Sequence, residues 1–89
     1  MIETTIRVLN RAGLHTRPAA MLVKLASQYK SDMYLVRDGF NINAKSIIGV
    51  MTLAAEQGCD LGLIVDGPDE VEAAKAVADL FEGGFGEQL

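Results

Sequence analysis

The chain has few of the residues that mark secreted, disulfide-bonded or membrane proteins. It contains no tryptophan, two prolines, one histidine and one cysteine among 89 residues. A single Cys59 cannot form an internal disulfide, and no apolar run approaches the length of a membrane span. The first residues, Met1-Ile2-Glu3-Thr4, lack the basic and apolar segments of a signal peptide. We therefore expect a cytoplasmic protein in which Cys59 is a small hydrophobic residue.

Positive charge and metal-ligand clusters are scarce as well. The formal net charge of -4 argues against a nucleic-acid-binding protein. No group of cysteines, histidines and carboxylates has metal-ligand spacing, so we expect neither a metal nor another cofactor. The basic side chains, however, concentrate in the first third, and the last third is acidic. A basic face could therefore dock an acidic protein partner; its candidates are Arg7, Arg11, Arg17, Lys24 and Lys30.

The hydrophobic pattern predicts one α+β domain over residues 1–89. Strands are expected at 2–9, 33–36, 40–43 and 59–66. Helices are expected at 16–29, from 46 to 54 or 55, and from about 67 to 83. The order β-α-β-β-α-β-α favours a four-stranded antiparallel sheet with three helices on one face, an open-faced β-sandwich. Two helical stripes should be buried, Ala19, Leu22, Val23 and Ala26 in the first and Ala74, Val77, Ala78 and Phe81 in the last; the burial of Met21 and Leu25 is left open.

The only histidine lies at the predicted start of the first long helix. The segment reads Gly13-Leu14-His15-Thr16-Arg17-Pro18-Ala19-Ala20. Pro18 suits the first turn of a helix, and Thr16 is the expected N-cap. His15 would therefore lie beside backbone N–H groups without partners, in the positive potential of the helix dipole, and Arg17 adds guanidinium donors. The segment predicts an anion site, for phosphate above all, although a lone histidine can also be an ordinary surface residue.

The short helix after Ser46 carries a second candidate surface. Val50 and Leu53 can face the sheet, but Ile47, Ile48 and Met51 cannot all point inward as well. We expect an exposed apolar docking patch on this helix, beside a helix face that carries Ala20 and Lys24. Gly49 has no side chain and would leave the patch accessible to a partner. The alternative is that Ile47 and Met51 fill gaps under neighbouring loops.

These two segments resemble those of a known family. Gly13 to Ala19 is similar to the active-site signature of HPr, the histidine-containing phosphocarrier of the bacterial phosphoenolpyruvate-dependent phosphotransferase system. The block Ala44-Lys45-Ser46-Ile47-Ile48-Gly49-Val50-Met51-Thr52-Leu53 resembles the regulatory serine segment of that family, at the same spacing. The resemblance covers essentially the whole chain.

The resemblance implies a carrier rather than an enzyme. His15 would accept a phosphoryl group at Nδ1 from phospho-enzyme I and pass it to a histidine of a sugar-specific or nitrogen-related EIIA domain. The Arg17 side chain and the N–H groups of Thr16 and Arg17 would stabilise the phosphate. Docking would use the two helices, through Ala20, Lys24, Ile47, Ile48, Gly49, Met51 and Thr52.

Ser46 is expected to cap the short helix. The resemblance implies a further role, phosphorylation by HPr kinase/phosphorylase, with a transcriptional regulator as an additional partner. We expect a monomer. Two other classes remain open, a small ligand-binding regulatory domain that uses His15 as a contact and a hydrolase dependent on a metal or on acid–base chemistry.

Overall fold

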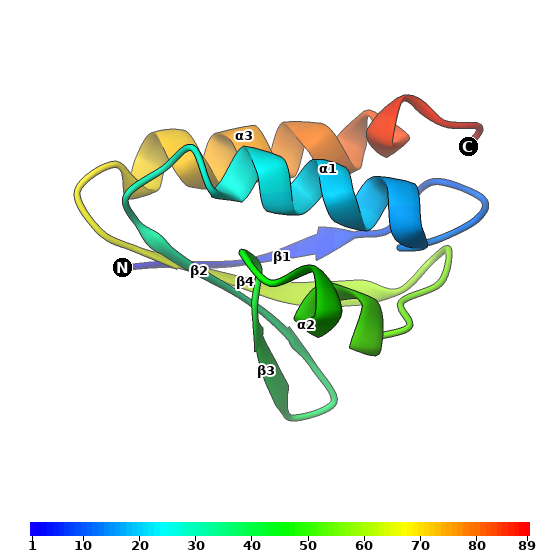
Figure 1. The fold of residues 1–89 in the computed structure, drawn as a ribbon, viewed down its shortest axis with the longest axis horizontal. Helices are drawn as coiled ribbons and strands as arrows, with labels where there is room; N and C mark the ends of the chain where they lie inside the picture. Colours follow the sequence, from blue (N-terminus) through cyan, green and yellow to red (C-terminus); the bar gives the residue numbers. More distant parts are fainter.

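The computed structural model describes all 89 residues, and its elements follow the predicted order (Figure 1). The strands are β1 (Ile2–Arg7), β2 (Asp32–Arg37), β3 (Phe40–Asn43) and β4 (Asp60–Asp66). The helices are α1 (Thr16–Ala26), α2 (Ile47–Thr52) and α3 (Glu70–Glu82), and the short 3₁₀ helix η1 (Gly84–Gly86) follows α3.

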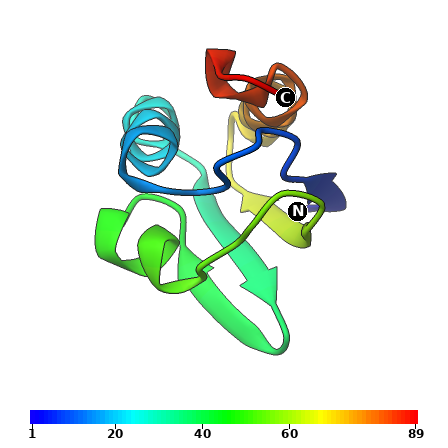
Figure 2. The same ribbon diagram turned by 90° about the vertical axis from the view of Figure 1, so that its right-hand side faces the viewer.

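The four strands form one antiparallel sheet in the order β1-β4-β2-β3. All three helices lie on one face of this sheet, as the view from one end of the molecule shows (Figure 2). The predicted open-faced β-sandwich is therefore confirmed.

Alternation of side chains along the two central strands explains the single covered face. Residues of β2 and β4 that point to the helices are fully buried, namely Met33, Leu35, Leu61, Leu63 and Val65. Their neighbours Tyr34, Val36 and Ile64 are half-buried on the other face. Because successive side chains in a strand point to opposite faces, one apolar layer between sheet and helices forms the core. Cys59 is half-buried and packs against this layer as a free thiol.

Three predicted elements end earlier than the sequence indicated. The helix expected to reach residue 54 or 55 ends at Thr52, with Leu53 as its C-cap. The strand expected to reach residue 9 ends at Arg7, because Val8 continues the pairing irregularly, with hydrogen bonds to Cys59 and Gly58. The helix expected to reach residue 29 ends at Ala26. Beyond it, Gln28 and Tyr29 donate to carbonyls three residues back, which tightens the chain into a turn.

The start of α1 also differs from the prediction. His15 is the N-cap and Thr16 is the first helical residue, because His15 has an extended backbone while its carbonyl accepts from the Ala19 N–H at 3.0 Å.

The predicted apolar stripes of the two long helices are largely buried. In α1, Ala19, Leu22 and Ala26 are buried and Val23 is half-buried, as are Met21 and Leu25. In α3 the stripe is buried except for half-buried Ala78, and Pro68 precedes the N-cap Asp69. None of these helices is long and apolar enough to cross a membrane.

Candidate functional site

Gly13 positions the loop that leads into α1. Its φ is +75°, and a Cβ at this position would lie 2.6 Å from the carbonyl oxygen of Ala55. The next residue, Leu14, is buried and donates its N–H to the same oxygen at 2.9 Å. A glycine is therefore required for the loop to press against the segment after α2, and this contact fixes the start of α1 near α2.

His15 is exposed at the N-terminus of α1. Its side chain is 43% accessible, and its ring makes no capping hydrogen bond to the helix. The first helical hydrogen bond begins at Ala19, so the N–H groups of Thr16 and Arg17 precede the ladder. The structure thus brings together the histidine, the guanidinium and the helix start that the sequence singled out; their action on an anion stays a prediction.

A carboxylate that the sequence analysis did not find lies at this site. Glu87 places both carboxylate oxygens 3.0 Å from His15 Nε2. Nη1 of Arg17 donates to Glu87 Oε2 at 2.9 Å and to the carbonyl oxygen of Phe85 at 3.2 Å. The hydrogen bond from His15, followed by those from Arg17 and Asn10, lowers the pKa of the Glu87 carboxyl below its usual value. One acidic residue near the end of an acidic segment gives no signal in sequence, and only the fold brings it to His15.

The structure confirms the expected cap and faces of α2. Ser46 is the N-cap, and its Oγ accepts from the Gly49 N–H at 3.1 Å. Val50 and Leu53 are buried, as predicted. The remaining apolar side chains are exposed, namely Ile47, Ile48 and Met51, and Ile48 is 74% accessible. They do not fill gaps under loops, so α2 presents an apolar surface.

The other predicted docking residues lie on α1 and around the same short helix. Ala20 and Lys24 are exposed on α1, Thr52 is exposed on α2, and Gly49 is half-buried. The two helices contact each other and lie side by side near the His15 end of the fold (Figures 1 and 2). Lys24 also lines a shallow depression with Leu80 of α3, so it lies toward α3 rather than over α2.

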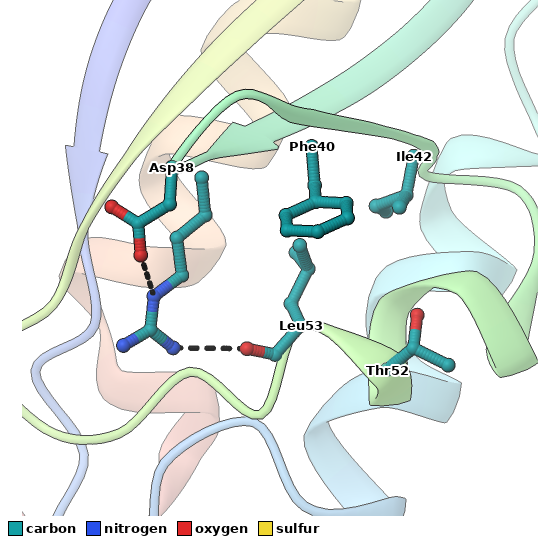
Figure 3. Close-up of a pocket in the computed structure, with 6 residues that line it drawn as sticks. Asp38, Phe40, Ile42, Thr52 and Leu53 are labelled. Carbon is teal, nitrogen blue, oxygen red and sulfur yellow. Dashed lines mark hydrogen bonds and ion pairs between the residues drawn. The ribbon is translucent and has the colours of Figure 1, made fainter.

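A separate cavity of about 360 Å³ lies between the C-terminal end of α2 and the β2–β3 hairpin (Figure 3). Its lining residues are Arg37, Asp38, Phe40, Ile42, Thr52 and Leu53. The guanidinium of Arg37 is already occupied, by the Leu53 carbonyl at 2.9 Å and the Asp38 carboxylate at 3.7 Å. The cavity is therefore lined by residues other than the exposed apolar side chains of α2. Around His15 the surface is a shallow depression, and no group of three or more potential metal ligands is present in the molecule.

Comparison with known proteins gives a consistent result. Residues 2–83 match the family described as "PTS HPr component phosphorylation site". The chain is 53% identical over 88 residues to "Phosphocarrier protein HPr" of Treponema pallidum (strain Nichols), covering 99% of this chain and 100% of that protein. A crystal structure of HPr-C-His from Thermoanaerobacter tengcongensis superposes with a TM-score of 0.95 at 47% identity and covers 100% of both chains. A structure of an HPr dimer from the same organism has a TM-score of 0.76 at 45% identity, covering 98% of this chain and 100% of that one.

Proposed function

This chain belongs to the HPr family of phosphocarrier proteins, and from that premise we propose that it carries a phosphoryl group on His15. One observation supports this assignment most directly. The His15 ring is exposed, takes no part in capping, and lies at a helix N-terminus where the N–H groups of Thr16 and Arg17 precede the hydrogen-bond ladder. Such a helix start favours an anion close to the ring.

The proposed reaction is a transfer between histidines. A ring nitrogen of His15, Nδ1 by resemblance to the family, attacks the phosphorus of a phosphohistidine on enzyme I in line with the bond that breaks. The N–H groups of Thr16 and Arg17, together with the Arg17 guanidinium, stabilise the charge on the phosphoryl oxygens. Because the site is a shallow depression, the phosphoryl group remains accessible for transfer to a histidine of a sugar-specific or nitrogen-related EIIA domain.

The proposed docking surface consists of exposed residues of α1 and α2. Around His15 it combines the charged side chain of Lys24 with Ala20 and the apolar α2 patch, defined as Ile47, Ile48 and Met51, flanked by Gly49 and Thr52. A surface that combines exposed apolar side chains on α2 with a basic side chain on α1 suits an acidic protein partner with an apolar contact at its centre. Enzyme I and EIIA domains are the proposed partners, and a transcriptional regulator is a further one.

Ser46 is the proposed regulatory residue, phosphorylated by HPr kinase/phosphorylase. Its hydroxyl caps α2 and lies next to the apolar patch. A phosphate there would be compatible with the helix start, so the fold would tolerate it. It would add negative charge to the docking surface and repel the acidic partners proposed above.

The test is incubation with phosphoenolpyruvate, labelled in its phosphoryl group, and enzyme I. We expect label on the wild-type protein and none on His15→Ala, which should remain folded because the ring is exposed and caps nothing. Addition of a cognate EIIA domain should then remove the label. Absence of label on the wild type, or label that survives in His15→Ala, would overturn the proposed function.

A further inference from the structure

The segment after α3 is fixed against the active-site loop. In Figure 1 it lies at the same end of the molecule as the loop that precedes α1. Phe85 is buried, and its ring meets that of Phe81 edge-on with centroids 4.8 Å apart. The Glu87 N–H donates to the Gly84 carbonyl at 2.9 Å, and at the next residue the Gln88 carbonyl accepts from the Arg11 N–H at 2.8 Å. Glu87 thus lies between two anchors and does not belong to a free tail.

The Glu87 carboxylate accepts hydrogen bonds from three side chains. Besides His15 and Arg17, Asn10 Nδ2 donates to Oε1 at 3.0 Å. Asn10 is fully buried, and its Nδ2 also donates to the Gly13 carbonyl at 2.8 Å. The opposite amide orientation would set Oδ1 against two acceptors, so these contacts fix the amide. Asn10 therefore holds Glu87 in place with a buried group, and the Glu87 side chain is only 17% exposed.

This arrangement determines which nitrogen of His15 carries the proton. An ionised carboxylate can only accept hydrogen bonds, and the lowered pKa of Glu87 keeps it ionised near neutral pH. The ring nitrogen 3.0 Å from its two oxygens, Nε2, must then be the donor. In a neutral imidazole with its hydrogen on Nε2, the free lone pair is on Nδ1.

We propose that Glu87 is a positioning residue for phosphoryl transfer, which keeps the His15 proton on Nε2 and leaves Nδ1 as the nucleophile. This inference rests on the proposed carrier function. In the step, the Nδ1 lone pair forms the new N–P bond, the N–P bond of the donor breaks, and its electron pair returns to the donor's ring. No proton leaves His15. The ring becomes positively charged, with its Nε2–H still directed at the Glu87 carboxylate, which stabilises the phosphorylated form.

The test compares Glu87→Gln with Glu82→Gln, which removes the same charge from an exposed site on α3. In the wild type and in Glu82→Gln, the ¹⁵N signals of the unphosphorylated ring should show the Nε2–H tautomer. In Glu87→Gln the amide can donate as well as accept, so a mixture of tautomers is expected. The equilibrium level of phosphorylation by phospho-enzyme I should fall about fivefold in Glu87→Gln only, as expected when a charged acceptor becomes neutral.

The two readouts separate this proposal from the carrier function. The tautomer is measured without any partner, so a wild type that accepts no phosphoryl group would overturn the carrier function and leave the tautomer result standing. A wild type that accepts the group, with Glu87→Gln unchanged in tautomer and level, would overturn the role of Glu87. A higher phosphorylation level in Glu87→Gln would also overturn it, because the carboxylate would then be competing with the phosphoryl group.

Discussion

At the scale of single residues, Asp69 is a carboxylate whose ionised form is stabilised by hydrogen bonds within the fold. It precedes α3 and accepts hydrogen bonds from the Ser31 hydroxyl and N–H and from the Lys30 N–H, 38 and 39 residues away in sequence. The Ser31 hydroxyl and the Lys30 N–H lower its pKa from 3.8 to about 2. Asp69 thus links the turn between α1 and β2 to the start of α3, and this link is strongest when the carboxyl is ionised.

The acid stability of the protein should reflect this carboxylate. Because the folded state lowers the pKa of Asp69, its contribution is fully present above pH 3.8 and is lost as the pH falls toward about 2. Urea unfolding at a series of pH values should show a smaller decline of the unfolding free energy through this window for Asp69→Asn than for the wild type. Equal declines for the two proteins would contradict the assignment.

At the scale of elements, α2 is short enough for its cap to matter. It has six residues, and Ser46 satisfies the Gly49 N–H at its start. Its inner side is held by buried Val50, while its outer side is apolar and exposed. The same serine therefore combines two separable properties, a hydrogen bond that stabilises α2 and a position next to the proposed docking surface.

Two substitutions should separate these properties. Ser46→Ala should lower the unfolding free energy by about 1 kcal/mol, because the cap is lost, and leave the transfer rate unchanged. Ser46→Asp retains a capping oxygen and favourable charge at the helix start, so its stability should remain near that of the wild type. Its transfer from phospho-enzyme I should nevertheless slow about threefold or more, through repulsion of acidic partners.

Urea unfolding and single-turnover transfer on the same samples measure both effects. Equal slowing in the two variants would assign the effect to the cap and contradict the role of charge.

Phosphorylation of Ser46 can be tested directly with labelled ATP and HPr kinase/phosphorylase. The wild type should be labelled and Ser46→Ala should not. A labelled Ser46→Ala would place the modification at another residue.

At the scale of the whole molecule, the proposed docking surface exists only because α1 and α2 pack side by side on the sheet. The basic residues of the first third do not all join it. Arg7 is paired with Asp60 through contacts of 2.7 and 3.2 Å, which also lower the pKa of Asp60. Arg17 is paired with Glu87 beside His15, whereas Lys24 is exposed on α1 and has no ion pair. Because a relative is known as a dimer, the expected monomer remains a prediction.

A matched pair of exposed aliphatic residues tests this surface. Ile48→Asp on α2 should reduce transfer from enzyme I about tenfold, since it places charge at the centre of an apolar contact. Val71→Asp on α3 should leave transfer unchanged, although Val71 is exposed to a similar degree, 70% against 74%. Both variants should unfold within about 0.5 kcal/mol of the wild type. A similar loss in both would indicate a general effect of charge and contradict a docking surface on α2.

Most of the fold was predictable because its signals are local. The alternation of Leu61, Leu63 and Val65, and the Asp38-Gly39 turn, depend on near neighbours in sequence. The ends of elements were less predictable. Whether a segment such as 27–29 continues a helix or tightens into a turn depends on competition among closely similar hydrogen-bond patterns.

The amino-acid sequence alone predicts where His15 lies and what surrounds it locally. Pro18, Arg17 and the following helix formers place His15 at a helix start, and the spacing of apolar residues after Ser46 makes one face of α2 exposed. Only the tertiary structure decided that Glu87, 72 residues from His15, binds its ring. The reason is physical: helix starts and periodic faces follow from neighbours along the chain. The Glu87 contact instead depends on burial of Phe85 and Asn10, which direct a distant carboxylate to one nitrogen of the ring.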